Sequence, residues 1–316
     1  MRDTSRIRPP RAAELRDTAE LLGRHLPPTP VVATPLLPHG FLKLETFQPT
    51  GSFKVRGALA AMSALEPGVR AITASAGNHG LGMAHAAALL GREATVVVAE
   101  DASPAKVDAL RAFPVEVVRH GTGYDAAEHR ALELAEHGGV YISAYNDVHV
   151  IAGQASVGRE LAHQVPGPLT IVCPVGGGGL CAGLSVWAST RDDVEVVGVE
   201  AEQSRAVSAA VAAGRTVAVP VGETIADGLA GNIDDPCVTP SIIGRHAADL
   251  VAVGEPELRD AMRWLFREHG LVVEGAAAAG VAAALAGRLD LPRDRQVAFV
   301  LTGRNIAATR YAEVLA

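Results

Sequence analysis

Lys54 is the residue whose type and setting most directly indicate covalent chemistry. It follows the turn-like segment Thr50-Gly-Ser-Phe53 and begins a run in which apolar residues recur at helical spacing, which predicts a lysine at the mouth of a helix. The hydroxyl of Ser52 is predicted to cap that helix. The helix dipole and burial both lower the pKa of an amine placed there, and such a lysine can form a Schiff base. The alternative is an ordinary solvated lysine on a first turn.

A run of four glycines is the second chemical signal. Gly176, Gly177, Gly178 and Gly179 follow a strand-like apolar run and open a predicted helix. Because glycine has no side chain, the backbone amides can approach an anion closely, and the start of the helix adds favourable charge. A phosphate is therefore the ligand that this run predicts. The run is neither a P-loop nor the dinucleotide fingerprint. Glu200, which ends a strand about twenty residues on, keeps a dinucleotide-binding alternative open.

The segment Ser75-Ala-Gly-Asn-His-Gly80 lies between a predicted strand and a predicted helix. Its amides and the side chains of Ser75, Asn78 and His79 are expected to face one spot, which suits a small carboxylate and a ring hydroxyl. An ordinary strand-to-helix turn is the alternative. Thr302 closes a late strand and is expected to present its hydroxyl to the same cleft, although most such threonines only cap turns.

The elements that must position these residues alternate between short apolar strands and amphipathic helices. In the first half, the pattern predicts a helix at 12–26 and short extended segments at 31–38 and 41–45. It then predicts strands at 69–74, 94–99, 115–119 and 140–144, separated by helices at 81–90, 104–113 and 124–136. In the second half it predicts helices at 148–164, 180–189, 203–213, 256–269 and 274–286, and strands at 169–175, 194–199 and 297–302. This alternation predicts parallel sheets with right-handed crossovers.

We therefore predict an α/β protein with two open parallel-sheet lobes and a cleft between them. Residues 68–146 are predicted to form a small domain, and residues 1–67 together with 147–316 are predicted to form a large domain that carries Lys54 and the glycine run. Open sheets bind ligands in clefts at the carboxyl ends of their strands.

The composition excludes several classes of function. The chain has 316 residues, of which 48% are hydrophobic, and its net charge of -7 argues against a nucleic-acid partner. The start of the chain lacks the apolar stretch of a signal peptide, and no later segment is long enough to cross a membrane, so a cytoplasmic protein is predicted. Cys173, Cys181 and Cys237 form neither a CxxC pair nor a disulfide framework, and Cys173 is predicted to be a buried free thiol.

Taken in order, three segments resemble the pyridoxal-phosphate (PLP) enzymes of the tryptophan-synthase β fold, also called fold type II. They are Gln48-Pro-Thr-Gly-Ser-Phe-Lys-Val-Arg-Gly-Ala58, Ser75-Ala-Gly-Asn-His-Gly80 and Gly176–Gly179. Within these enzymes the chain is most similar to the threonine/serine dehydratase and serine racemase branch. Further segments that match this branch are Ala152-Gly-Gln-Ala, Glu223-Thr-Ile-Ala-Asp-Gly-Leu229 and Glu274-Gly-Ala-Ala. The likeness covers nearly the whole chain.

The resemblance implies that pyridoxal 5'-phosphate is the cofactor and that Lys54 holds it through a Schiff base. Gly176–Gly179 would cradle the phosphate, Asn78 would contact the ring hydroxyl, and Phe53 would pack near the ring. Thr302 takes the place of a hydroxyl residue, commonly serine, that hydrogen-bonds the pyridine nitrogen. A neutral hydroxyl does not hold that nitrogen protonated, which suits elimination of a β-substituent over transamination.

The substrate carboxylate is predicted to bind near Ser75, Asn78, His79 and Gln154. Racemases of this branch have a serine where this chain has Ala76, and that serine is a second acid/base on the face opposite the lysine. Alanine cannot carry a proton, so the sequence favours elimination over racemisation.

The predicted function is a PLP-dependent dehydratase, or ammonia-lyase, which converts L-threonine, L-serine or a related β-hydroxy amino acid to a 2-oxo acid and ammonia. Lys54 is its predicted general base. One alternative is an amino-acid racemase, and another is a catabolic lyase for an unusual substrate such as hydroxyaspartate or a hydroxyectoine-derived compound. A nicotinamide-dependent oxidoreductase using Gly176–Gly179 and Glu200, and a non-catalytic amino-acid sensor, are rivals from other classes.

Two further expectations come from the family resemblance. Glu200 matches a carboxylate that helps to hold a mono- or divalent cation in related enzymes. Ala206 stands near the place where a second acidic ligand is often found, so the cation is left open. The chain is expected to form a homodimer that takes a small hydroxy amino acid as its substrate.

Overall fold

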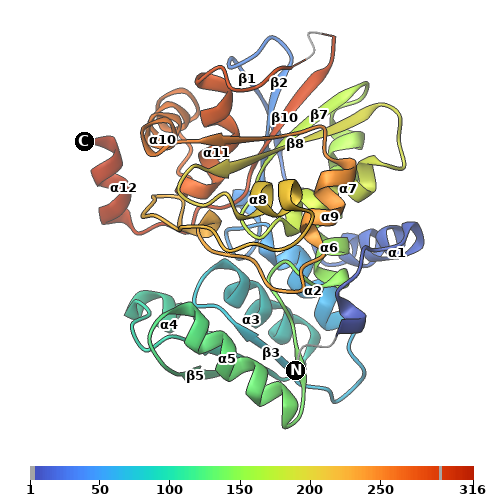
Figure 1. Ribbon diagram of the computed structural model, residues 1–316, viewed down its shortest axis with the longest axis vertical. Helices are drawn as coiled ribbons and strands as arrows, with labels where there is room; N and C mark the ends of the chain where they lie inside the picture. Colours follow the sequence, from blue (N-terminus) through green and yellow to red (C-terminus); the bar gives the residue numbers. More distant parts are fainter. Residues whose placement is uncertain (1–3, 292–293) are drawn as a thin grey trace.

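The computed structural model describes residues 4–291 and 294–316, and its strands form two separate sheets, of six and four strands. Figure 1 shows the larger sheet with its helices above and the smaller sheet with its helices below. The α/β fold class with two sheet lobes, predicted from the sequence, is confirmed. The exact domain boundaries stay a prediction.

The larger sheet contains β1 (Val31–Thr34), β2 (Gly40–Leu44), β7 (Leu169–Pro174), β8 (Val194–Ala201), β9 (Asp249–Val253) and β10 (Gln296–Leu301). Their order across the sheet is β1-β2-β10-β7-β8-β9. Only the β1–β2 hairpin is antiparallel, and every other described pair is parallel. Strands β7, β8 and β10 are almost continuous apolar runs because helices cover both faces of the sheet.

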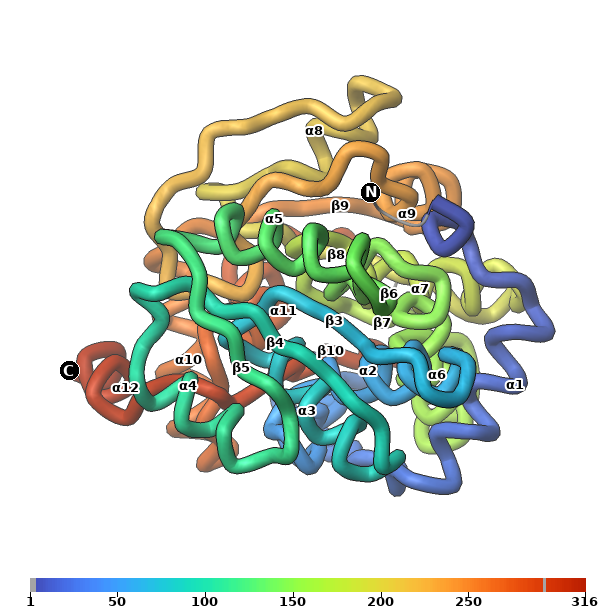
Figure 2. The backbone as a smooth tube through the Cα atoms, turned by 90° about the horizontal axis from the view of Figure 1, so that it is seen from below, coloured from blue at the N-terminus to red at the C-terminus, as the bar shows by residue number. Residues whose placement is uncertain are grey.

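The smaller sheet contains β3 (Ala71–Ala74), β4 (Ala94–Val98), β5 (Glu116–Arg119) and β6 (Val140–Tyr141), and its helices are α3 (Asn78–Leu90), α4 (Pro104–Arg111) and α5 (Gly123–Glu136). The strand order is β5-β4-β3-β6, and all of the pairs are parallel. Figure 2 shows α5 on one face of this sheet and α3 on the other. Alternation along β4 explains the arrangement, since Val97 packs with Ala131 of α5 whereas Val96 packs with Ala84 of α3.

Helices α2 (Lys54–Ser63) and α6 (Val148–Gln164) lie between the two sheets (Figure 1) and are in backbone contact. A Cβ added to Gly153 of α6 would stand 2.7 Å from the Cα of Gly57 in α2, so only glycine permits this approach. On its other side α2 meets α3, where a Cβ on Gly82 would stand 3.1 Å from the Lys54 carbonyl. The helix that carries Lys54 is therefore held closely on two sides.

The remaining helices complete the larger lobe. They are α1 (Ala12–Gly23), α7 (Gly179–Ala188), α8 (Ala206–Ala213), α9 (Thr239–His246), α10 (Glu255–His269), α11 (Gly275–Leu285) and α12 (Ala308–Leu315), with 3-10 turns η1 (Thr4–Arg6), η2 (Glu45–Phe47) and η3 (Asp227–Leu229). The alanine-rich α11 is buried against β7 and β10 on one face of the sheet, and α7, α8 and α9 cover the other. No helix among the described residues is long and apolar enough to span a membrane.

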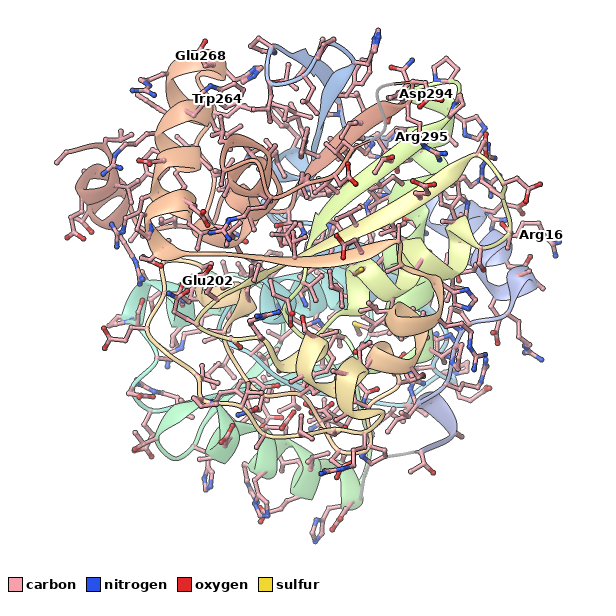
Figure 3. The ribbon with its side chains drawn as sticks, turned by 45° about the horizontal axis from the view of Figure 1, so that its top comes forward. Arg16, Glu202, Trp264, Glu268, Asp294 and Arg295 are labelled. Carbon is pink, nitrogen blue, oxygen red and sulfur yellow. The ribbon has the colours of Figure 1, made fainter. Side chains whose placement is uncertain are left out.

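The carboxyl and amino edges of the larger sheet can be followed in Figure 3. Glu202 lies just past the end of β8, whereas Arg295 lies just ahead of β10 at the opposite end of the sheet. The glycine run and Thr302 follow the carboxyl ends of β7 and β10, so both lie at the first of these edges. This is the edge at which open sheets bind ligands.

Candidate active site

Lys54 is the first residue of α2, and its amine lies in a half-buried position. Its Nζ donates to the carbonyl of Ala144 at 2.9 Å and lies 5.2 Å from the centre of the Phe53 ring. Burial lowers the pKa of this amine to about 8, and the nearby Glu274 opposes the shift. The lowered pKa expected from the sequence is therefore confirmed, and burial is its main cause.

The predicted capping role of Ser52 is wrong. Phe53 occupies the N-cap position with helical backbone angles (φ -58, ψ -20), and no side chain caps the helix. Ser52 instead pairs with Gly303 as an antiparallel bridge, and the Phe53 amide donates to the Thr302 carbonyl at 3.0 Å. The segment that follows β10 therefore accepts a hydrogen bond from the amide just before α2, as a capping group would. This contact places Thr302 beside Phe53.

The glycine run places its backbone amides at the start of α7. Among the described residues, no group accepts a hydrogen bond from the consecutive amides of Gly176 to Cys181, and Ala182 is the next residue whose amide donates, to the Gly178 carbonyl at 2.8 Å. Unpaired amides at a helix start bind phosphate well. The loop therefore fits the phosphate of PLP, and that role stays a prediction that this geometry supports.

Close neighbours explain why this loop consists of glycine. A Cβ on Gly177 would collide with the ring of Tyr145, and one on Gly176 would stand 2.8 Å from the Gly228 carbonyl. Gly178 has φ +84, a left-handed conformation that favours glycine, and the hydroxyl of Thr239 donates to the Gly177 carbonyl at 2.7 Å. The loop is therefore held in one shape by residues from three other segments.

A second set of unpaired amides lies at the start of α3. The Ser75 hydroxyl accepts from the Gly77 amide at 3.1 Å, but the amides of Ala76 and of residues 78–80 have no acceptor among the described residues. Such a helix start can receive a carboxylate. The contact of Ser75 and Asn78 with a substrate stays a prediction that this geometry supports.

Asn78 is held by Glu274 and Asn305. Its Nδ2 donates to both carboxylate oxygens of Glu274, at 2.8 and 3.1 Å, and its Oδ1 accepts from Asn305 at 2.6 Å. Glu274 is buried, and burial raises the pKa of its carboxyl to about 7. The sequence assigned no role to Glu274 or Asn305. Their shared partner, Asn78, lies about two hundred residues away in the chain, so no local pattern connects them.

His79 and Gln154 are more deeply buried than the sequence suggested. The Nε2 of His79 lies 3.3 Å from the Ile142 carbonyl, while burial and the nearby Lys54 lower its pKa to about 3, so the ring is neutral. Gln154 is buried in α6 against Gly57, and neither of its amide atoms has a partner among the described residues. Contact of either side chain with substrate stays a prediction.

The segment Ala144–Tyr145 contacts both Lys54 and the loop of Gly176–Gly179. The Ala144 carbonyl accepts from Lys54, and the next residue places its ring against Gly177. The Tyr145 hydroxyl in turn accepts from the Asp234 amide at 2.9 Å. No sequence motif marks these two residues, because Ala144 contributes only its backbone carbonyl and Tyr145 contributes the packing of its ring.

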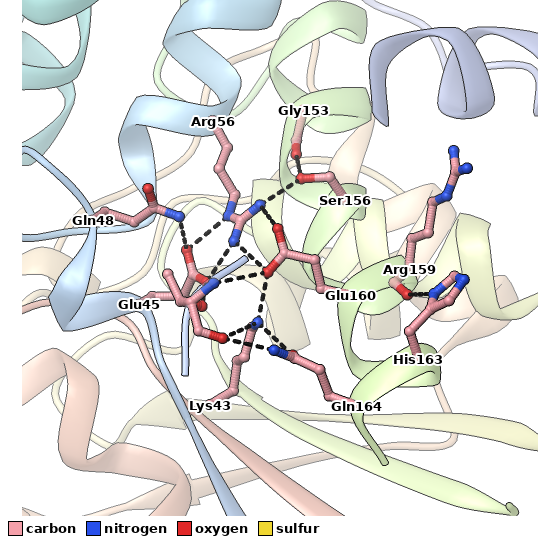
Figure 4. A network of polar contacts seen from close by, with 11 residues as sticks. Lys43, Glu45, Gln48, Arg56, Gly153, Ser156, Arg159, Glu160, His163 and Gln164 are labelled. Atoms are coloured by element: carbon pink, nitrogen blue, oxygen red, sulfur yellow. Dashed lines mark hydrogen bonds and ion pairs between the residues drawn. The ribbon is translucent and has the colours of Figure 1, made fainter. Parts of the chain in front are cut away.

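A buried ionic network anchors α2 just beyond Lys54 (Figure 4). Arg56 donates to both oxygens of Glu45 at 2.7 and 2.8 Å, to both oxygens of Glu160 at 2.6 and 2.9 Å, and to Ser156 at 3.1 Å. Lys43 donates to Glu160 at 2.6 Å and completes a balance of two cations and two carboxylates. The network ties α2 to η2, β2 and α6, and thereby fixes the helix that carries Lys54.

Glu200 uses its carboxylate on protein groups. It accepts from the Val207 amide at 2.9 Å and from both the amide and the hydroxyl of Ser208, so it caps the start of α8. Among the described residues there is no group of three or more His, Cys, Asp or Glu side chains arranged to hold a metal ion. The sequence left a cation at Glu200 open, and the contacts described here give this carboxylate a structural role at the start of α8.

The chain is similar to known proteins over most of its length. Residues 22–303 match the family described as pyridoxal-phosphate dependent enzyme. The L-threonine ammonia-lyase of Thermotoga maritima is 39% identical over 84% of this chain and 67% of its own length. The catabolic L-threonine dehydratase of Escherichia coli is 34% identical over 87% of this chain and 85% of its own length.

Among solved structures, a threonine deaminase from T.th. is similar, with a TM-score of 0.85, 34% identity and coverage of 94% of this chain and 99% of that one. Maize serine racemase has a TM-score of 0.88 at 26% identity and covers 96% of each chain. With a lysine of lowered pKa, a loop that fits a phosphate and these relatives, the chain belongs to the family of pyridoxal-phosphate dependent enzymes.

Proposed function

We propose that this protein is a PLP-dependent dehydratase, or ammonia-lyase, that converts L-threonine, L-serine or a related β-hydroxy amino acid to a 2-oxo acid and ammonia. The observation that carries the proposal is the half-buried Lys54 amine with a pKa of about 8, placed beside one anion receptor of α3 and linked through Ala144–Tyr145 to another at α7. The relatives named threonine ammonia-lyase and threonine dehydratase support this reaction class.

Each group of the site has a role in that reaction. Bound PLP supplies the electron sink. The amides of Gly176–Gly179 would hold its phosphate, and those at the start of α3 would receive the substrate carboxylate. The Lys54 amine takes the proton from Cα and passes it to the departing β-hydroxyl, which leaves as water. A water molecule then replaces the amino group, which departs as ammonia, so the atoms balance.

Racemisation is the second candidate, because maize serine racemase and an aspartate racemase are structural neighbours. Ala76 disfavours it, since a methyl group cannot return a proton to the face opposite Lys54. Chiral analysis of the amino acid that remains after partial turnover separates the two. We expect unreacted L-threonine or L-serine to stay in the L form.

The test of the proposal uses the small number of lysines. The chain has three, and Lys43 is fully buried in the ionic network while Lys106 is exposed on α4. We expect borohydride to fix PLP on Lys54, which peptide mapping can assign without ambiguity. Lys54→Ala should abolish both the visible absorbance of bound PLP and the release of 2-oxo acid from L-threonine, whereas Lys106→Ala should keep the absorbance. Turnover by Lys54→Ala at the level of the parent protein would contradict the assignment.

A homodimer is part of the proposal and rests on the family resemblance. Light scattering of the purified holoenzyme measures it directly, and we expect twice the 32.6 kDa mass of one chain. A mass of one chain across the micromolar range would remove the dimer from the proposal without affecting the reaction. A cytoplasmic location likewise stays a prediction.

A further inference from the structure

A cavity of about 470 Å³ lies on the larger lobe, outside the site described above. Its walls come from the end of α8, the loop that follows it, and α9, which Figure 1 shows side by side. Val211 and Pro240 contribute apolar surface, and Thr216 and Ser241 contribute hydroxyl-bearing side chains. This combination of apolar surface with a few polar groups is typical of small-molecule sites.

Two arginines give the cavity its charge. Arg215 and Arg245 both line it, and no aspartate or glutamate does. Within the part of the chain that the structure describes, neither guanidinium has a carboxylate partner, and the one hydrogen bond recorded for either joins Arg215 to the Thr216 carbonyl at 3.3 Å. The carboxyl-terminal ends of α8 and α9 carry partial negative charge, which favours a nearby guanidinium. Most N–H donors of the two guanidinium groups nevertheless have no acceptor among the described residues. The free donors suit an anion with several oxygens.

Helix α9 lines this cavity and also contacts the loop of Gly176–Gly179. Pro240, Ser241 and Arg245 face the cavity. On the loop side, Thr239 donates to the Gly177 carbonyl at 2.7 Å, and a Cβ on Gly178 would stand 2.9 Å from Ile243. A ligand that draws α9 toward the cavity therefore acts on the loop through direct contacts.

We propose that the cavity is a second ligand site, for a small phosphate monoester with an apolar body, and that its occupancy is transmitted through α9 to the glycine loop. The two arginines bind the phosphate, and the surface of Val211 and Pro240 receives the apolar part. This inference does not depend on which reaction the enzyme catalyses.

Binding is tested with phenyl phosphate and borohydride-treated holoenzyme, in which PLP fills its own phosphate site. Calorimetry should show one saturable site per chain, weakened about tenfold by Arg215→Gln or Arg245→Gln, because each removes charged hydrogen bonds. Arg267→Gln is the matched control, since Arg267, like Arg245, is exposed in the last turn of a helix, and its helix α10 does not line the cavity. Absence of saturation at millimolar phenyl phosphate, or equal affinity in all three variants, would overturn the site. Equal affinity for inorganic phosphate would overturn the need for an apolar body.

Transmission is tested separately with Thr239→Val, which keeps the shape of the side chain but removes its hydrogen bond to Gly177. In the untreated holoenzyme, phenyl phosphate should shift the absorbance of bound PLP or its dissociation constant. Thr239→Val should still bind phenyl phosphate but show a smaller shift. An unchanged shift in this variant, or no shift in the parent protein at saturation, would overturn the coupling through α9.

Discussion

The Lys54 amine makes the cofactor-free protein sensitive to pH at one residue. Capture of the PLP aldehyde needs a neutral amine, and burial lowers the pKa of Lys54 to about 8. We expect the rate of covalent capture, followed by absorbance, to rise with pH to a midpoint near 8 and to fall about tenfold per pH unit well below it. Lys54→Ala provides the blank. A midpoint near the ordinary lysine value of 10.5 would show that the amine is solvated.

At this scale, residues within contiguous motifs were predictable from the sequence and their distant partners were not. Lys54 and the glycine run could be identified because the residues next to them in the sequence predict the turn, strand and helix that surround them. The contact of Asn78 with Glu274 joins residues on different lobes, and the contact of Lys54 with Ala144 involves only a backbone carbonyl. Neither leaves a periodic or compositional signal in the chain.

Helix α2 depends on its ionic anchor. Replacing Arg56 by Met would leave the carboxylates of Glu45 and Glu160 buried without their main cation, and losing one partner of a buried pair costs about 3–5 kcal/mol. We expect Arg56→Met to lower the free energy of unfolding by an amount of that order, measured by urea titration. The control is Arg70→Met, because Arg70 forms exposed pairs with Glu93 and Glu116. Its cost should be below about 1 kcal/mol, and equal losses in the two variants would contradict the anchor.

Most elements agree with the periodic pattern because their apolar residues face one core. Helix α4 also begins with a side-chain cap, in which the Ser103 hydroxyl accepts a hydrogen bond from the Lys106 amide. The elements α9, β9 and α12 were not predicted. Helix α9 is short and contains Pro240 and Gly244, which weaken a helical pattern, and β9 is a half-buried edge strand. Their positions are set by packing against the rest of the lobe.

The buried carboxyls of Glu274 and Glu200 bind a proton more tightly in the folded protein than in the unfolded chain. Burial raises the pKa values of Glu274 and Glu200 from the ordinary 4.5 to about 7. Between these values the folded protein keeps protons that the unfolded chain releases. The contribution of these two carboxyls to the free energy of unfolding therefore falls as pH rises through this window.

Glu274→Gln, which keeps a neutral side chain of the same shape, should remove part of that fall. We expect the difference in unfolding free energy of the cofactor-free protein between about pH 5 and about pH 7.5 to shrink by up to about 3 kcal/mol, as measured in urea. Glu268, labelled on α10 in Figure 3, is exposed and makes Glu268→Gln a suitable control. The same pH slope in the parent and in Glu274→Gln would show that Glu274 titrates normally.

The scarcity of lysine has a practical consequence. If PLP is attached to Lys54, as we propose, Lys106 is the lysine left for coupling through a side-chain amine, because Lys43 is fully buried in the ionic network. It lies on α4 and faces Asp227 of the other lobe at 3.6 Å. A solid support attached there would hold the molecules in one orientation, and a fluorophore at that point would report on the spacing of the two lobes while the enzyme turns over.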